Sequence, residues 1–170
     1  MKIRQATEGD AAAITEIYNE AVLQTTAVWN DCTVDITNRI KWLSDRQNAG
    51  FSVLVAVDQA NSVLGYATYG AWRPWDGYRH TVEDSIYVDK NARGKGTGAA
   101  LMKVLIQQAT LQGKHIMVAG IESSNEASLA LHRKFGFTDA GRLSEVGCKF
   151  GHWLDLNFLH LRLDSRANPD

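Results

Sequence analysis

Three glycines at alternate positions, Gly94, Gly96 and Gly98, directly precede a segment with the apolar spacing of a helix. Where a helix begins without side chains, its unpaired backbone N–H groups and the positive end of its dipole are open to an anion. Arg93 and Lys95 place two cationic side chains beside those N–H groups. This combination favours a binding site for a phosphate or pyrophosphate group.

The same turn could instead be a plain crossover between a strand and a helix, because a glycine motif alone is weak evidence. Two known nucleotide motifs do not fit it. The pattern G-x-x-x-x-G-K-[ST] is absent, and the dinucleotide fingerprint lacks its acidic residue about 20 positions further on. The spacing therefore favours phosphate binding and leaves the structural crossover open.

The elements that would position this turn are strand and helix patterns along the whole chain. Apolar, β-branched and aromatic runs predict strands, and apolar residues three and four positions apart predict helices. Thr7 with Asp10, Asp35 and Asn125 can cap three of the helices. The expected strands are Lys2–Gln5, Phe51–Val57, Ser62–Trp72, Thr81–Val88, Lys114–Ile121, Thr138–Val146 and Trp153–Leu163, and the expected helices carry Ile14 to Val22, Ile36 to Leu43, Leu101 to Ala109 and Asn125 to Phe135.

The last expected strand changes its pattern in the middle. Leu154, Leu156 and Phe158 are apolar at alternate positions, and from there Leu159 and Leu161 are apolar instead. A strand presents alternate residues to one face, so one extra residue is needed to keep both sets on the same face. We expect a β-bulge near Phe158, with burial of both faces of the strand as the alternative.

Composition bounds the class of protein. The chain has 170 residues, 45% of them hydrophobic, and a formal net charge of −1. These values are typical of one globular domain and give no electrostatic argument for a nucleic-acid or membrane partner. No signal peptide is visible, so we expect a cytoplasmic protein whose cysteines, Cys32 and Cys148, are free buried thiols. We expect a single domain over 1–163 and a loose tail over 164–170.

Two motifs resemble those of the GCN5-related N-acetyltransferase (GNAT) superfamily and stand in its order. Arg93-x-x-Gly96-x-Gly98 resembles the acetyl-CoA signature, and Asn125-x-x-Ser128-x-x-Leu131-His132-x-x-Phe135-Gly136-Phe137 resembles the second motif. The resemblance implies an α/β (α+β) fold of the acyl-CoA N-acyltransferase type, with a mixed, mostly antiparallel seven-stranded sheet flanked by four helices. It also implies that the fourth and fifth strands separate around the pantetheine arm of acetyl-CoA.

The resemblance makes acetyl-CoA the expected co-substrate. Its pyrophosphate would lie on the glycine turn, and its pantetheine arm would pair with the preceding strand like an added strand. The backbone N–H of Val88 would stabilise the oxyanion of the acyl transfer. The residues implied in acetyl-CoA binding are Ile86, Tyr87, Val88, Arg93, Gly94, Lys95, Gly96, Thr97, Gly98 and Asn125.

Acyl transfer to an amine also needs a base, and Glu83 is the candidate. It shares one side of an expected strand with Ser85 and Tyr87. The pKa of a free Glu is about 4.3, so partial burial would have to raise the pKa of Glu83. The alternative is a surface Glu paired with Arg79 or a lysine. His132 stands where many relatives have a Tyr acid, and it either protonates the departing thiolate or only packs against the cofactor.

Within the superfamily, the chain is most similar to the phosphinothricin and L-methionine sulfoximine N-acetyltransferases. This resemblance runs nearly end to end and includes Tyr18-Asn19-Glu20-Ala21-Val22, Thr81-Val82-Glu83 and Val146-Gly147-x-Lys149-Phe150-Gly151-x-Trp153-Leu154-Asp155. It implies acetylation of the α-amine of L-methionine sulfoximine, methionine sulfone or phosphinothricin, which detoxifies these analogues. Arg73 or Arg79 could hold the α-carboxylate. The implied substrate residues are Arg73, Pro74, Trp75, Asp76, Glu83, Asp84 and Ser85.

The resemblance further implies a homodimer with the segment Lys149–Trp153 near its interface. Two other interpretations stay open: an acetyltransferase of the same fold acting on a peptide, protein or polyamine amine, and a non-catalytic CoA-binding regulator. Arg73 and Arg79 argue against a polyamine, and Glu83 argues against a regulator without activity. The Trp and Arg residues of 72–79 could equally be loop anchors. The histidines lack H-x-x-x-H spacing, so no metal is expected.

Overall fold

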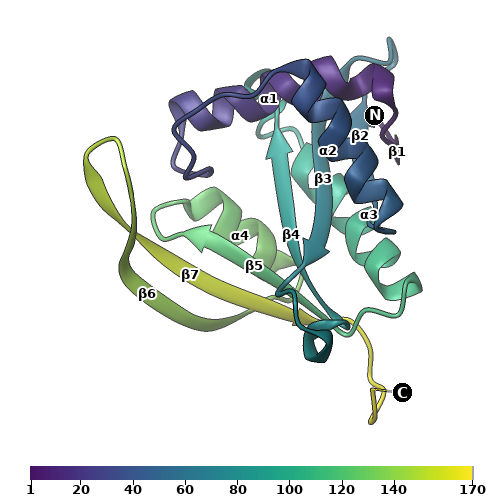
Figure 1. The fold of residues 1–170 in the computed structure, drawn as a ribbon, viewed down its shortest axis with the longest axis vertical. Helices are drawn as coiled ribbons and strands as arrows, with labels where there is room; N and C mark the ends of the chain where they lie inside the picture. The colour runs from purple at the N-terminus through teal and green to yellow at the C-terminus, as the bar shows by residue number, and fades with distance from the viewer. Residues whose placement is uncertain (170) are drawn as a thin grey trace.

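The computed structural model describes residues 1–169, and Asp170, the end of the expected tail, lies outside them. One seven-stranded sheet runs through the molecule, with α1 and α2 on one face and α3 and α4 on the other (Figure 1). In chain order the elements are β1 (Lys2–Gln5), α1 (Ala11–Gln24), α2 (Ile36–Asn48), β2 (Val53–Val57), β3 (Val63–Ala71), β4 (Thr81–Val88), α3 (Thr97–Leu111), β5 (Ile116–Glu122), α4 (Glu126–Lys134), β6 (Thr138–Lys149) and β7 (His152–Arg162).

The strands lie in the order β1-β2-β3-β4-β5-β7-β6, and among the described strands only β4 and β5 pair in parallel. These two strands pair over three positions, from Thr81 opposite Ile116 to Glu83 opposite Val118. Beyond Glu83 they separate, and Figure 1 shows the ends of the two arrows pointing apart. The predicted fold class is therefore confirmed, and the fourth and fifth strands separate as the family resemblance implies.

Two apolar cores lie on the two faces of the sheet, because successive side chains of a strand point to opposite faces. In β2, Leu54 and Ala56 pack with α3 in one core, whereas Val53 and Val55 pack with α1 and α2 in the other. All five residues of β2 are buried. The sheet is thus covered on both sides, which fixes the positions of β3 and β4 between the two helix layers.

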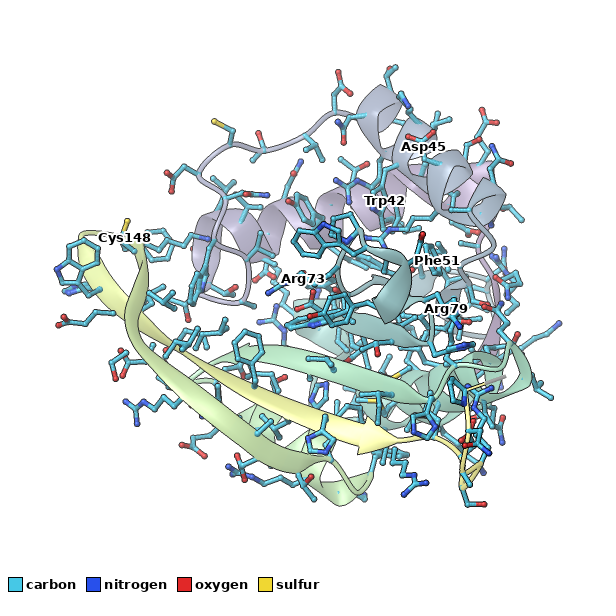
Figure 2. The ribbon with its side chains drawn as sticks, turned by 60° about the horizontal axis from the view of Figure 1, so that its bottom comes forward. Trp42, Asp45, Phe51, Arg73, Arg79 and Cys148 are labelled. Atoms are coloured by element: carbon cyan, nitrogen blue, oxygen red, sulfur yellow. The ribbon has the colours of Figure 1, made fainter. Side chains whose placement is uncertain are left out.

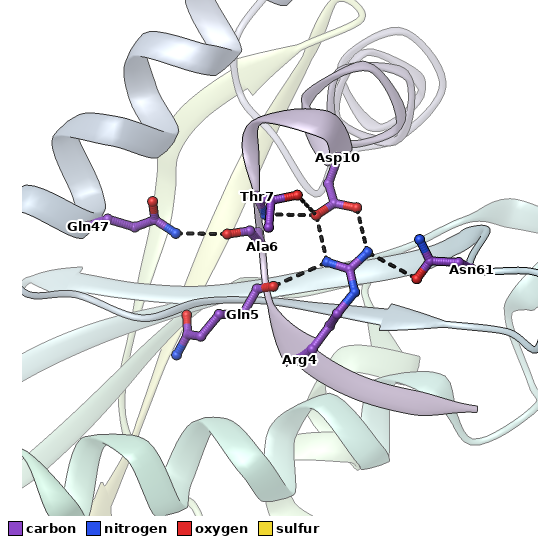
Figure 3. Close-up of polar contacts among 7 residues, drawn as sticks. All are labelled: Arg4, Gln5, Ala6, Thr7, Asp10, Gln47 and Asn61. Atoms are coloured by element: carbon purple, nitrogen blue, oxygen red, sulfur yellow. Dashed lines mark hydrogen bonds and ion pairs between the residues drawn. The ribbon is translucent and has the colours of Figure 1, made fainter.

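The start of α1 is tied to β1 by a polar cluster (Figure 3). The Thr7 backbone N–H donates to Asp10 Oδ2 at 2.7 Å, so the predicted capping pair is confirmed. Asp10 also accepts two hydrogen bonds from Arg4, at 2.7 and 2.8 Å, and is only 5% exposed. Asp35 and Asn125 cap α2 and α4 as predicted, through the N–H groups of residues 38 and 128.

We expect Asp10→Asn to lower the free energy of unfolding by about 2 kcal/mol near neutral pH, because a charged, bidentate pair is lost. The bond from Arg4 is the largest of the effects that hold the pKa of Asp10 below its usual range. A lowered pKa stabilises the fold above the unfolded-state pKa, and that stabilisation is lost as pH falls through the folded-state pKa.

Urea unfolding of wild type and Asp10→Asn across this acid range checks the prediction. Asp45→Asn is the control, because the side chain of Asp45 is 61% exposed in its pair with Lys41 and should contribute little. Equal stability of the Asp10 and Asp45 variants would contradict the assignment.

The second helix buries only part of the apolar face that its sequence predicts. Ile36 is 49% exposed, whereas Leu43 is buried as expected and Arg39 is only 6% exposed. The Arg39 guanidinium lies 4.2 Å from the ring centroid of Tyr18 and 4.7 Å from that of Trp42. A delocalised guanidinium stacks on aromatic faces, so here an arginine takes a place that the pattern gives to an aliphatic residue.

A bulge lies at the predicted place in the β6–β7 ladder but in the other strand. Asp139 pairs with Leu159 and Gly141 with Phe158, so Ala140 is the extra residue. β7 itself pairs with β5 without interruption. The expectation of an extra residue in the last strand is therefore wrong. Leu159 and Leu161 of β7 pack in the core with α3, whereas Phe158, on the other face, contacts Trp72 of the loop after β3.

Both cysteines are free as expected, but they are exposed rather than buried. Cys148 lies near the tip of the β6–β7 hairpin (Figure 2). After β7, Asp164 Oδ1 lies 2.7 Å from His115 Nδ1, and Arg166 donates to the Gly113 carbonyl at 2.6 Å. None of the helices within residues 1–169 combines the length and the apolar content that crossing a membrane requires.

Candidate active site

The glycine turn has the open geometry that its sequence predicts. Gly94 and Gly96 have φ angles of 73° and 83°, in the left-handed region that residues with side chains disfavour. A Cβ atom at either position would meet no atom within 4 Å. Gly98 differs, because a Cβ there would lie 3.3 Å from Leu131 of α4. The first two glycines thus leave the mouth of α3 open, and the third lets α3 approach α4.

A cleft with a volume of about 880 Å³ opens between the separated ends of β4 and β5 and reaches the glycine turn. Its size suits a cofactor or a small ligand. The end of α1 and the starts of α3 and α4 complete its walls. The predicted residues that line it are Asp84, Ser85, Ile86, Tyr87, Val88, Arg93, Gly94, Gly96, Thr97, Gly98, Asn125 and His132, whereas Lys95, Glu83 and the four residues Arg73, Pro74, Trp75 and Asp76 do not.

The two cations beside the turn already have partners. Arg93 donates to Glu20 on α1 at 2.6 Å and to the Val88 carbonyl at 3.2 Å. Lys95 donates to the Asn91 carbonyl at 2.8 Å. Both side chains are exposed, so an anion on the turn competes with these contacts in water, where ion pairs are weak.

His132 lies at the floor of the cleft in a buried pair with Asp84. Its Nδ1 lies 2.8 Å from the Ser128 carbonyl, and its Nε2 lies 3.0 Å from Asp84 Oδ2. A carbonyl only accepts, so Nδ1 carries a hydrogen, and a proton must also lie between Nε2 and Oδ2. Burial opposes a charge on His132, but the bonds to Asp84 and Ser128 outweigh it and raise the pKa of His132.

Glu83 points to the opposite face of β4 from Asp84, the face covered by α1 and α2. It is half-buried, and its Oε1 lies against β5, 3.1 Å from where a Cβ of Gly120 would be. Burial, followed by the negative charge of Asp84, raises the pKa of Glu83, while Arg73 and Arg46 partly oppose this. A raised pKa is what a carboxylate needs to act as a base near neutral pH.

The loop after β3 brings one of its four predicted residues toward Glu83. Arg73 stacks on Trp72 at 4.1 Å and acts on the charge of Glu83. Figure 2 shows Arg73 on this loop, below Trp42 of α2 and above β5 and β7. Trp75, an implied substrate residue, is 65% exposed, and its ring lies 6.3 Å from that of Tyr78. Pro74 and Asp76 are also exposed and stay outside the cleft.

A buried carboxylate that no motif of the sequence indicates helps to build the cleft. Glu122, at the end of β5, is 7% exposed and accepts from Thr26 Oγ1 at 2.9 Å and from the Ser124 N–H at 2.9 Å. This ties the loop after α1 to β5. In the sequence, a carboxylate at the end of an apolar strand is the one feature that could have marked Glu122 as functional. Its partner Thr26 lies 96 residues away, so the contact itself could not be predicted.

The segment Lys149–Trp153 meets the same loop. Lys149 is 4% exposed and donates to the Val28 carbonyl, and the Trp29 ring fills the space where Gly147 would carry a Cβ. Phe150 lines the cleft although it is 56% exposed. The β6–β7 hairpin is therefore part of the cleft wall as well as an exposed apolar surface.

Similarity to known proteins agrees with this geometry. The L-methionine sulfoximine/L-methionine sulfone acetyltransferase of Salmonella typhimurium is 54% identical over 170 residues, 100% of this chain and 99% of that protein. The phosphinothricin N-acetyltransferase of Alcaligenes faecalis is 37% identical over 154 residues, 90% of this chain and 78% of that protein. A putative acetyltransferase structure from Salmonella typhimurium, with its cofactor acetyl-CoA, has a TM-score of 0.97, 53% identity, and coverage of 99% and 97%.

The sequence pattern of the acetyltransferase (GNAT) domain matches residues 3–158, which is most of the chain. The relatives bear the names that the resemblance of its motifs predicts, so that prediction is confirmed. Fold, sheet order and sequence pattern agree over the same residues. The chain belongs to the acetyltransferase (GNAT) family.

Proposed function

We propose that the chain is an acetyl-CoA-dependent N-acetyltransferase that acetylates the α-amine of small amino acid analogues such as L-methionine sulfoximine, methionine sulfone or phosphinothricin. The observation that carries the proposal is the cleft that runs from the separated ends of β4 and β5 to the open glycine turn. The relatives named for these substrates support the choice of acceptor.

On the donor side, the pyrophosphate of acetyl-CoA would lie on the backbone N–H groups at Gly94, Gly96 and Thr97. These residues line the cleft, and no side chain covers the two glycines. The pantetheine arm would run along the separated end of β4, where Ile86 and Val88 also line the cleft. The remaining donor contacts would be Tyr87, Arg93, Lys95, Gly98 and Asn125.

On the acceptor side, Glu83 would take a proton from the ammonium group and free the amine. The amine nitrogen would then bond to the thioester carbonyl carbon, and the carbon–sulfur bond would break as the thiolate leaves. The Val88 N–H would stabilise the oxyanion between these steps. Arg73, beside Glu83, would attract the carboxylate of the acceptor, with Ser85 lining the cleft on the same side.

His132 is a candidate proton donor for the thiolate, but its position makes donation costly. Both of its ring nitrogens are already hydrogen-bonded, to Ser128 and Asp84. Donation from Nε2 would leave the buried Asp84 carboxylate without its partner. We therefore propose that Asp84 positions His132 and does not contact the substrate directly.

A homodimer in a cytoplasmic setting completes the proposal. Leu143, Val146, Phe150 and Trp153 expose apolar surface on one hairpin, between 46% and 69% of each residue. Such a group of exposed apolar side chains marks an interaction surface. Sedimentation of wild type and a Trp153→Ser variant tests it, with a shift to monomer expected in the variant. The exposed free thiols of Cys32 and Cys148 are compatible with a reducing compartment.

The test of the function combines binding and turnover. Calorimetry should find acetyl-CoA binding to the purified chain without any acceptor. Release of free thiol should then follow on addition of methionine sulfone, L-methionine sulfoximine or phosphinothricin, and not with a polyamine or an N-terminal peptide. Preferred turnover of the peptide would overturn the acceptor assignment, and binding without any turnover would favour the regulator.

A further inference from the structure

Arg46 lies in the last turn of α2 and belongs to none of the motifs found in the sequence. Its side chain crosses to the sheet, and its guanidinium fills the space above Gly70 of β3. A Cβ at Gly70 would lie 1.7 Å from Arg46 Nη1 and 2.8 Å from Cζ. Gly70 pairs directly with Glu83, and directly opposite residues project to the same face. Arg46 therefore lies on the Glu83 side of the sheet.

No carboxylate of the described chain forms an ion pair with Arg46, and its side chain makes no hydrogen bond to residues 1–169. Among residues 1–169, the carboxylate that acts on Arg46 is Glu83, and the two do not form an ion pair. Burial is the largest effect on Arg46 and lowers its pKa, and Arg39 lowers it further. A partly buried cation without a partner is unfavourable, so this position suits an anion from outside the chain.

Arg39 adds to the positive charge on this side. It is 6% exposed, and its Nε has no hydrogen-bond partner among the described residues. Its guanidinium stacks on Trp42, and Arg46 lies 5.9 Å from the centroid of the same ring. Arg46 and Arg73 both act on the charge of Glu83, and Arg39 acts on Arg46. An amine alone gains nothing from these charges, whereas an amine that also carries a carboxylate does.

The chemistry of an α-amino acid fits this arrangement. Its amine and carboxylate are attached to one carbon, so an amine placed at Glu83 holds its carboxylate a few ångströms away. Glu83 Oε1 lies against Gly120, which lines the cleft, and Ser85 lines it on the same side of β4. An acceptor whose amine lies at Glu83 has Arg46 on the same face of the sheet, over Gly70, the residue that pairs with Glu83.

We propose that Arg46 binds the α-carboxylate of the acceptor while Glu83 accepts the proton of its amine. This inference rests on the proposed function and extends it: Arg46, with the exposed Arg73 at the entrance, makes the enzyme specific for acceptors with a free carboxylate. Binding of the carboxylate also neutralises Arg46, which otherwise opposes the raised pKa of Glu83. The acceptor itself then strengthens the base that deprotonates it.

The test compares methionine sulfone with its methyl ester, which keeps the amine and side chain but lacks the carboxylate charge. In wild type the acid should be the better acceptor. Arg46→Gln should raise the KM of the acid about tenfold to hundredfold, because a charge-assisted bidentate contact is lost, and leave the KM of the ester unchanged. Arg46→Lys should recover part of the preference. Arg133→Gln, an exposed arginine paired with Asp139, is the control and should keep the wild-type ratio.

A second variant tests the same contact without changing Arg46. Gly70→Ala places a methyl group where the guanidinium lies, and the flexible end of Arg46 must move away. Like Arg46→Gln, Gly70→Ala should reduce the preference for the acid over the methyl ester. An unchanged acid-to-ester ratio in both Arg46→Gln and Gly70→Ala would overturn the inference, with Arg46 left as a cation that stabilises the end of α2. Wild type that acetylates neither compound would instead overturn the proposed function.

Discussion

Glu83→Gln should lower kcat/KM by about 10²–10⁴-fold, the usual contribution of a positioned general base. The variant keeps the shape of the side chain and removes its ability to take a proton. Burial and the charge of Asp84 raise the pKa of Glu83. Wild-type activity should therefore fall as pH drops through that raised pKa, because the protonated carboxyl cannot accept a proton. The variant should lack this acidic limb, which a pH–rate profile for both proteins measures.

Two controls separate the base from a structural role. Glu16→Gln changes the same chemistry on an exposed position of α1 and should keep wild-type activity. Acetyl-CoA binding by calorimetry should be equal in wild type and Glu83→Gln, because Glu83 does not line the donor cleft. A Glu83→Gln enzyme with normal turnover and an unchanged acidic limb would remove Glu83 from the mechanism.

Gly96→Val should weaken acetyl-CoA binding about tenfold to hundredfold, since a branched side chain would fill the open space over the mouth of α3. Gly96 lines the cleft, and its Cβ position is empty within 4 Å. Loss of one or two charge-assisted hydrogen bonds to phosphate accounts for an effect of this size. Calorimetric titration with acetyl-CoA measures it directly.

The chain offers a matched control for the backbone strain in this variant. Gly113 has a φ of 70°, against 83° at Gly96, and its Cβ position is likewise empty. It lies beyond the other end of α3, outside the cleft. Gly113→Val should therefore lose similar stability and keep its affinity for acetyl-CoA. Equal affinities in the two variants would mean that the glycine turn does not hold the donor.

Features that depend on neighbours in sequence could be predicted well. The strand Thr81–Val88 has the predicted bounds, and Asp35 and Asn125 cap their helices as expected. Capping and apolar period act within a few residues, so a linear pattern carries them. The pattern failed where an unusual contact replaced the common one. In α2, Arg39 is stacked on aromatic rings and buried, whereas Ile36, expected on the buried face, is exposed.

Contacts between distant segments could not be predicted. Asp84 and His132 are 48 residues apart, and the sequence predicts separate roles for them, yet they form one buried pair. Arg46 carries no motif, and its place beside Glu83 depends on how α2 packs across β3. Nothing in a single sequence records the angle at which a helix crosses a sheet. The loop after β3 shows the opposite case. The sequence predicts Trp75 as a substrate residue, but the side chain is exposed.

The sequence by itself determined the open glycine turn and the family of the chain. Both follow from residue types at short, fixed spacings around Gly94 to Gly98. Only the tertiary structure decided that β4 and β5 separate after Glu83 and that Asp84 turns to His132. It also decided that Arg46 lies over Gly70, the residue that pairs with the candidate base. The physical reason is that separation and sidedness arise from packing of two helix layers on one sheet, where contacts join residues far apart in the chain.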